Sequence, residues 1–263
     1  MSTNTATPLR RLLITGAGGT VGQVLRDGLR ALADELSLLD LQPLQPRSGE
    51  EVFQGDVADL AVVRRAMAGC DACVHLAAIA TEAPFADILH ANFLGTWSVF
   101  EAARREGCQR LVFASSNHAT GFYPVGQRIG PEYPVRPDTY YGVSKVFGEA
   151  LGRMYHDKFG LQVACLRIGS ATEQPEDARH LSTWLSPGDL TLLVSACLTS
   201  PDLGFAIVYG ASANHRGWWD LDAGRRLGYE PKDDAEAFAA SVRDDPIGEF
   251  QGGPKFTEPG TTP

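Results

Sequence analysis

Tyr141 and Lys145 are two residues whose types and spacing suggest chemistry. Residues four apart lie on one face of a helix, and the preceding Pro137 and Asp138 supply a turn and a candidate N-cap for such a helix. An ammonium near a phenol favours the phenolate. We therefore predict that Tyr141 is a base that removes a proton from an alcohol. The same spacing also occurs on solvated helix faces, so the interpretation depends on the rest of the chain.

A glycine-rich turn follows a buried parallel strand expected at residues 11–15. Its G-x-x-G-x-x-G spacing lets the backbone approach a pyrophosphate, and the next helix offers its N-terminus to the negative charge. Asp40 ends the following strand, where a carboxylate accepts hydrogen bonds from the adenosine ribose and repels a 2′-phosphate. The pattern predicts NAD rather than NADP, with turn contacts from Gly16, Gly19, Thr20, Val21 and Gly22.

Further strands are expected at residues 36–40, 52–54, 72–76, 111–116 and 163–168, with helices at 58–68 and 85–105 between them. The carboxyl ends of these parallel strands meet at one edge of the sheet, where a dinucleotide binds. Ser116 ends one strand, and its hydroxyl is predicted to hold a substrate oxygen. The remaining cofactor candidates are Asp56, Val57, Leu76, Ala77, Ala78, Asn92 and Ile168.

The alternation of strands and helices loosens after residue 168. A polar loop at 171–186, a helix at 187–200, a strand at 205–209 and short helices at 220–227 and 233–243 are expected there. We therefore predict one α/β domain over residues 1–263. It comprises a leader at 1–8, a Rossmann-type doubly wound parallel sheet that binds NAD at 10–168, and a small substrate-binding lobe with a C-terminal tail at 169–263.

Composition excludes several classes of function. The net charge of −9 leaves no basic stripe for nucleic acid. The longest apolar run, 190–198, is far shorter than the ~20 residues of a membrane span. The five cysteines stand in apolar surroundings, so Cys70 and Cys73 are interpreted as core thiols, not a metal or redox site. We expect a cytoplasmic protein without a metal.

Several motifs together resemble those of the uronate dehydrogenase family, within the extended short-chain dehydrogenase/reductase superfamily. They lie at residues 114–118, 141–145, 167–170, 181–184, 209–214, 218–220 and 251–253. The resemblance covers about residues 10–255. It implies that NAD oxidises a hexuronic acid such as D-glucuronate or D-galacturonate at C1, which gives an aldarolactone and NADH. It also implies a homo-oligomer.

The resemblance assigns roles position by position. Tyr141 is the base, Lys145 is its electrostatic partner and a ribose ligand, and Ser116 holds the reacting oxygen. The sugar pocket is expected to be lined by Asn117, His118, Ser170 and, where relatives have a serine, Ala80. Since alanine lacks a hydroxyl, the loss of one hydrogen bond, worth about 0.5–1.5 kcal/mol, is expected to alter KM or sugar preference.

Arg179 is expected to bind the carboxylate of the substrate. A guanidinium presents a planar fork that matches a carboxylate with two hydrogen bonds. The alternative is an ordinary surface arginine beside Glu176 and Asp177.

Two other functions stay open at this point. An NDP-sugar epimerase or dehydratase would share the Tyr–Lys pair, although such relatives usually carry a larger C-terminal lobe. A protein that senses NAD without turnover would not need Tyr141, Lys145 and Ser116 together.

Overall fold

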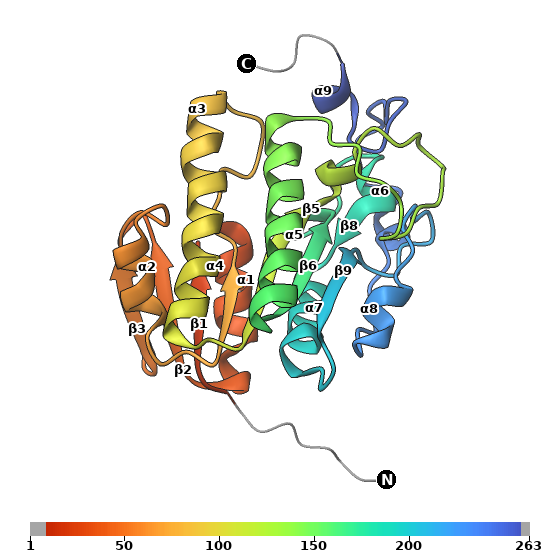
Figure 1. Cartoon of the computed structure of the whole chain (residues 1–263). Helices are drawn as coiled ribbons and strands as arrows, with labels where there is room; N and C mark the ends of the chain where they lie inside the picture. The colour runs from red at the N-terminus through yellow and green to blue at the C-terminus, as the bar shows by residue number, and fades with distance from the viewer. Residues whose placement is uncertain (1–8, 259–263) are drawn as a thin grey trace.

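Seven parallel strands form one twisted sheet in the order β3-β2-β1-β4-β5-β6-β9 (Figure 1). The computed structural model describes residues 9–258, so the leader predicted at 1–8 lies outside the described part. The strand order reverses between β1 and β4, which confirms the predicted doubly wound sheet. The strands are β1 (Leu9–Thr15), β2 (Ala33–Asp40), β3 (Glu50–Gln54), β4 (Ala72–His75), β5 (Arg110–Ser116), β6 (Gln162–Ile168) and β9 (Phe205–Gly210).

Helices cover both faces of the sheet. In front, in the view of Figure 1, stand α2 (Leu60–Met67), α4 (Gly95–Glu106) and α5 (Tyr140–Phe159). Behind it, α1 (Thr20–Gly28) and α7 (Pro187–Thr199) lie side by side and bury apolar side chains against the sheet, α1 near β1 and α7 near β5. Burial on both faces explains why the strands are nearly continuous runs of apolar residues.

The smaller elements differ in part from the prediction. The helix expected at 85–105 is divided into α3 (Phe85–Ile88), a π-helical stretch η2 (Leu89–Leu94) and α4. The loop expected at 171–186 contains a two-stranded parallel ladder around a helical turn, and the helix expected at 233–243 is a single 3₁₀ turn. These short elements are η1 (Arg30–Leu32), η3 (Asn117–Thr120), β7 (Ser170–Ala171), α6 (His180–Thr183), β8 (Trp184–Leu185), α8 (Asp222–Arg226), η4 (Ala235–Phe238) and α9 (Pro254–Thr257).

The N-cap of α5 is Thr139, and the prediction of Asp138 was wrong. Thr139 has extended backbone angles, and its Oγ1 accepts a hydrogen bond from the N–H of Gly142 at 2.9 Å. The helix therefore begins one residue later than expected. The carboxylate of Asp138 instead accepts hydrogen bonds from Thr139 Oγ1 at 3.1 Å and from His118, just after β5, at 2.8 Å.

The C-terminal half of the chain is joined to the main sheet. β9 pairs with β6 and α7 packs beside α1. Only the segments before, between and after these two elements lie outside the main sheet and its helices. An aromatic cluster connects those segments to the loop after β5 through Tyr209, Trp218, Trp219, Tyr123 and Ile129. Within residues 9–258, no helix has the length and apolar character to cross a bilayer, and the five cysteines are free and buried.

A buried ion pair ties α5 to β6. Arg167 donates to both carboxylate oxygens of Glu149 at 2.9 Å, and Ser115 donates to the same carboxylate at 2.7 Å. Glu149→Ala leaves the guanidinium buried without its partner, so we expect the free energy of unfolding to fall by about 3–5 kcal/mol in urea titrations.

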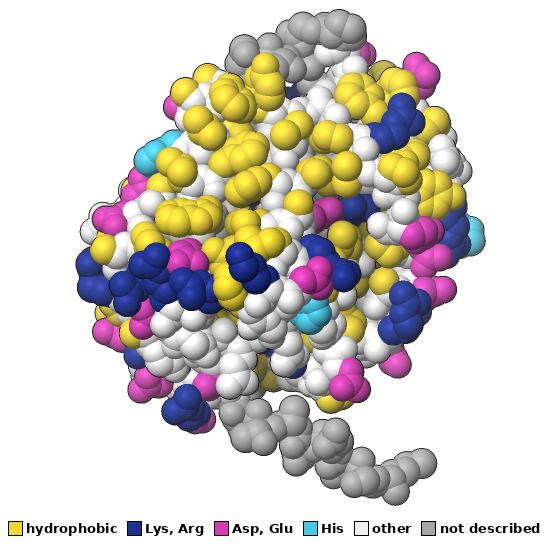
Figure 2. Space-filling view, in the orientation of Figure 1, with side chains coloured by type: hydrophobic (Ala, Val, Ile, Leu, Met, Phe, Trp, Pro, Cys, Tyr) yellow, Lys and Arg dark blue, Asp and Glu magenta, His cyan; other side chains and the backbone are white. Residues whose placement is uncertain are grey.

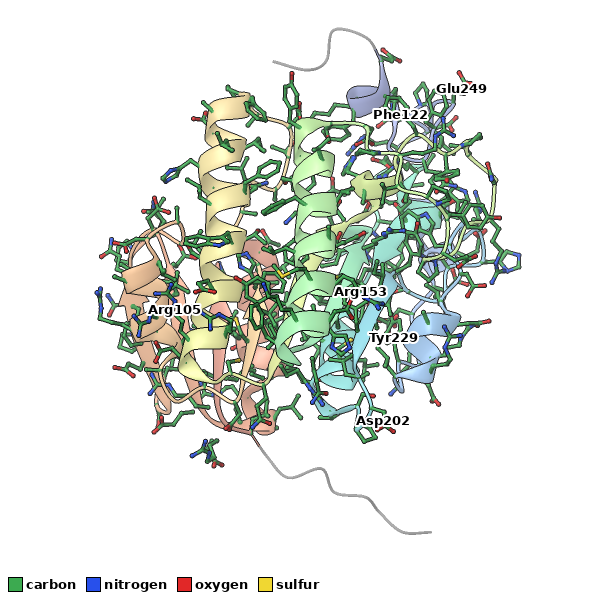
Figure 3. The ribbon with its side chains drawn as sticks, in the orientation of Figure 1. Arg105, Phe122, Arg153, Asp202, Tyr229 and Glu249 are labelled. Carbon is green, nitrogen blue, oxygen red and sulfur yellow. The ribbon has the colours of Figure 1, made fainter. Side chains whose placement is uncertain are left out.

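Asp157→Ala is the matched control on the same helix. It breaks only the exposed pair between Asp157 and Arg153, whose side chain projects from the front of α5 (Figure 3). Its effect should stay below about 1 kcal/mol. Equal losses in the two variants would contradict the importance of the buried pair.

Candidate active site

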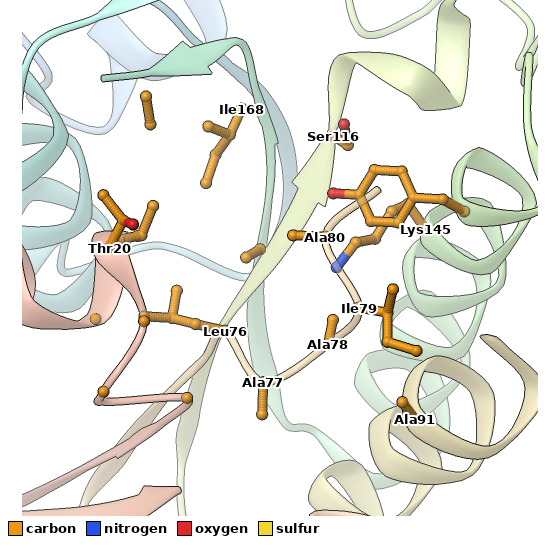
Figure 4. Close-up of a pocket in the computed structure, with 18 of the residues that line it drawn as sticks. Thr20, Leu76, Ala77, Ala78, Ile79, Ala80, Ala91, Ser116, Lys145 and Ile168 are labelled. Carbon is orange, nitrogen blue, oxygen red and sulfur yellow. The ribbon is translucent and has the colours of Figure 1, made fainter. Parts of the chain in front are cut away.

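A cavity of about 1030 Å³ opens at the carboxyl ends of the strands, where the strand order reverses. Figure 4 shows Ser116 and Lys145 on one side of it, with Thr20, Leu76 and Ile168 across from them. The predicted site residues that line it are Gly16, Gly19, Thr20, Val21, Gly22, Asp40, Asp56, Val57, Leu76, Ala77, Ala78, Ala80, Ser116, Asn117, His118, Tyr141, Lys145, Ile168, Ser170 and Arg179.

Two glycines of the turn, Gly16 and Gly22, have no room for a side chain. Gly16 has a φ of 71°, and a Cβ there would lie 2.7 Å from the backbone nitrogen of Ala77. A Cβ on Gly22 would lie 2.2 Å from the carbonyl oxygen of Gly16. Gly19, the N-cap of α1, has no side chain to accept from the N–H groups of the first turn. Those N–H groups are therefore available to a phosphate, and the turn fits a dinucleotide.

Asp40 stands beside this turn. Its carboxylate accepts hydrogen bonds from the N–H of Gly18 at 2.8 Å and of Gln42 at 2.9 Å. It is half-buried at the cavity wall, which suits a ribose diol and repels an added phosphate. Farther along the wall, a hydrogen bond from His90 holds the pKa of Asp56 below its usual value.

Asn92 is the one predicted cofactor residue that does not line the cavity. Its side chain accepts from the N–H of Ile79 at 2.9 Å and donates to the carbonyl of the same residue at 3.0 Å. It also donates to Ser144 on α5 at 3.0 Å. Asn92 therefore holds the loop after β4 against α5, so its effect on the cavity is indirect.

Tyr141 and Lys145 share one face of α5, as predicted, and both are buried. The Nζ of Lys145 lies 5.2 Å from the centre of the Tyr141 ring. Burial raises the pKa of Tyr141 to about 12, while a hydrogen bond with Ser116 lowers it and the charge of Asp138 raises it. Burial also lowers the pKa of Lys145 to about 7. Burial thus opposes the easy ionisation of the phenol that was expected from the Tyr–Lys spacing.

Arg179 reaches the cavity from the start of α6, and its partners are neutral. Its Nε donates to the carbonyl of Gln251 at 2.9 Å, and its Nη1 donates to Ser170 Oγ at 3.4 Å. With the Asn117 amide oriented to donate to the Ile168 carbonyl, the Asn117 oxygen accepts from Nη2 at 2.9 Å. Among residues 9–258 no carboxylate forms an ion pair with this guanidinium, and burial lowers its pKa. The alternative of an ordinary surface arginine beside Glu176 and Asp177 does not describe this residue, because Arg179 is partly buried and lines the cavity.

Three residues near the cavity were missed in the sequence. Asp138 accepts from Nδ1 of His118 at 2.8 Å, and Phe256 packs its ring against that imidazole with centres 4.6 Å apart. Gln251 supplies the carbonyl that holds Arg179. Gln251 lies in the motif at residues 251–253, Asp138 was considered from the sequence only as an N-cap, and Phe256 was not considered.

The glycine turn, the acidic residue at the end of β2 and the Tyr–Lys pair on one cavity define an NAD-dependent oxidoreductase with a Rossmann fold. A family model described as "NAD dependent epimerase/dehydratase family" matches residues 12–185. The chain belongs to that family.

Known relatives agree with this assignment. The uronate dehydrogenase of Pseudomonas putida is 45% identical over 95% of this chain and 96% of its own length. The crystal structure of a mutant uronate dehydrogenase from Agrobacterium tumefaciens complexed with NAD is 48% identical, with a TM-score of 0.91 over 96% of this chain and 98% of that chain.

A glucuronic acid dehydrogenase from Chromohalobacter salexigens has a TM-score of 0.90 at 43% identity, over 95% of this chain and 97% of that chain. The resemblance inferred from the motifs and the prediction of NAD are thereby confirmed.

Substitution of Asp40 tests the preference for NAD. Asp40→Ser removes the charge that repels a 2′-phosphate and the ribose acceptor, so we expect NAD to bind about tenfold more weakly and NADP more tightly. Fluorescence titration with each dinucleotide measures both dissociation constants. Asp34→Ser, at the exposed start of the same strand, is the control. An unchanged ratio of NAD to NADP affinity in Asp40→Ser would contradict the role of Asp40.

Proposed function

We propose that this protein oxidises a hexuronic acid, such as D-glucuronate or D-galacturonate, at C1 with NAD, and that the products are an aldarolactone and NADH. Arg179 carries the proposal. It is a partly buried guanidinium that has only neutral partners among the described residues and lines the same cavity as Tyr141 and Ser116. A cation in that state favours an anionic ligand, and the carboxylate of a uronic acid supplies one.

The residues divide the chemistry between them. Tyr141 takes the proton of the C1 hydroxyl, and Ser116, which shares a hydrogen bond with that phenol, steadies the reacting oxygen. NAD, when bound, accepts the hydride that leaves C1. Lys145 supports the phenolate with its charge and binds the ribose. Arg179 anchors the far end of the sugar, so that C1 lies near the base.

The sugar pocket has further polar walls. We infer that His118, Asn117 and Ser170 contact the sugar, because all three line the cavity around Arg179. Ala80 contributes no hydroxyl there, so the affinity for the sugar is expected to differ from that of relatives with a serine. We propose that residues 10–168 hold NAD and that residues 169–263 serve the sugar, apart from β9, which pairs in the main sheet, and α7, which packs on that sheet.

We also propose a homo-oligomer in the cytoplasm. Figure 2 shows apolar side chains gathered on the face formed by α3, η2, α4 and α5. The large apolar residues exposed on these elements are Phe85, Leu89, Leu94, Trp97, Tyr140, Val143, Met154 and Phe159. An apolar face of this kind marks an interface, and a second copy would cover it. Light scattering should give a multiple of 28.3 kDa for the native chain and a smaller mass for Trp97→Glu.

The reaction is tested by following NADH absorbance with the protein, NAD and a panel of uronic acids. We expect turnover of D-glucuronate or D-galacturonate, and Tyr141→Phe should lower kcat by about 10²–10⁴-fold because it removes the base. The dissociation constant for NAD should change little in that variant. Folded protein that turns over no uronic acid would reject the proposal.

The same variant tests the alternative of a sensor of NAD, which would keep its function without the phenol. The alternative of an NDP-sugar epimerase is tested in the native protein, since such an enzyme would convert a UDP-sugar without net NADH.

A further inference from the structure

The motif at residues 251–253 takes no part in the proposed reaction. It lies in residues 247–257, here called the C-terminal strap, which crosses the loop after β5 and ends in α9. Phe250 packs its ring on Phe122, with centres 5.4 Å apart, and the N–H of Val125 donates to the carbonyl of Glu249 at 2.9 Å. Figure 3 shows Phe122 and Glu249 at this end of the molecule. The strap is therefore fastened to the loop that precedes α5.

Gln251 is the centre of these contacts, and it is 1% exposed. Its Oε1 accepts from the indole of Trp219 at 2.8 Å, and its Nε2 donates to the carbonyls of Pro124 at 3.1 Å and Gln127 at 2.7 Å. Its backbone N–H donates to the carbonyl of Tyr123 at 2.8 Å. The amide side chain therefore has both of its N–H groups and its oxygen engaged.

The backbone carbonyl of Gln251 points the other way and accepts from Arg179 Nε at 2.9 Å. The next two residues, Gly252 and Gly253, pack too closely on their neighbours to carry a side chain without a shift. A Cβ on Gly253 would lie 3.2 Å from Arg179 Cδ, and one on Gly252 would lie 1.9 Å from Asp138 Oδ2. The strap thus packs directly on the arginine and on the carboxylate that holds His118.

These contacts set the donors that Arg179 can offer. A guanidinium has five N–H groups, and the carbonyl of Gln251, Ser170 and Asn117 engage three of them. The two that remain are one on Nη1 and one on Nη2, and a carboxylate binds such N–H groups of a guanidinium. Holding Nε on the strap keeps that pair of donors in one orientation.

We propose that Gln251 is a positioning residue for Arg179, and that its side chain, by locking the strap, sets the affinity of the site for the carboxylate of the substrate. The inference rests on the proposed function. Gln251 touches neither the base nor the glycine turn, so its effect should fall on the sugar and not on the chemical step or on NAD.

The test is a double-mutant cycle on KM for D-glucuronate and D-galacturonate. Gln251→Ala should raise KM about tenfold, through loss of an oriented charged hydrogen bond, while kcat and the dissociation constant for NAD change less than about threefold. In an Arg179→Ala background the same substitution should leave KM unchanged, because the residue through which it acts is gone. A general structural defect would instead lower kcat, weaken NAD binding and persist in that background.

Glu249→Ala is the matched control on the strap, since its side chain is exposed and it should leave KM unchanged. If Gln251→Ala does not fold, Trp219→Phe removes the donor to Gln251 Oε1 and keeps the aromatic stack on Tyr209, and it should raise KM in the same direction.

An unchanged KM in a folded variant at Gln251 or Trp219, with Arg179→Ala raising it, would overturn the inference and leave the proposed function standing. No turnover of any uronic acid by the native protein would overturn both.

Discussion

Removing a guanidinium from water without a counter-ion costs free energy, and the active site of this protein is arranged around one such group. Arg179 donates hydrogen bonds only to a backbone carbonyl, a hydroxyl and an amide oxygen among the described residues. Asp177 and Asp138 act on its charge without forming an ion pair, and burial outweighs them, so the pKa of the guanidinium is lowered. A buried cation held by neutral acceptors favours an anionic ligand, which is why the proposed function places the carboxylate of the sugar at Arg179, in the same cavity as Tyr141.

The sheet brings these groups together because its strands are parallel. Ser116 stands at the end of β5 and Ile168 at the end of β6, and the glycine turn leaves β1 at the same edge. The long α5 then carries Tyr141 and Lys145 across this edge. Burial at this edge makes proton loss from the phenol of Tyr141 harder and proton loss from the ammonium of Lys145 easier.

Much of this could be predicted from residue types. The glycine spacing predicted a tight turn, the acid at the end of β2 predicted a ribose ligand, and the Tyr–Lys spacing predicted a shared helix face. The structure brings all of these residues to one cavity. The carboxylate role of Arg179 came from resemblance, because an arginine beside two acids looks like any surface arginine.

Other features could not be predicted, for physical reasons. Gln251 acts on Arg179 through a backbone carbonyl, which every residue has, and Asp138 meets His118 across twenty residues of irregular loop. The start of α5 was misplaced by one residue because Asp and Thr are both good N-caps. The pKa of Tyr141 depends on burial, which spacing does not reveal.

We propose that the charge of Arg179, which forms no ion pair among the described residues, selects the substrate. The most direct measurement compares kcat/KM for D-glucuronate with that for its neutral amide, D-glucuronamide, in the native protein and in Arg179→Leu. Because the acid can accept charged hydrogen bonds, we expect kcat/KM for D-glucuronate to exceed that for D-glucuronamide roughly tenfold or more in the native protein. In Arg179→Leu we expect the ratio of the two values to be near one. Equal activity on the two sugars in the native protein, or the same preference after Arg179→Leu, would contradict it.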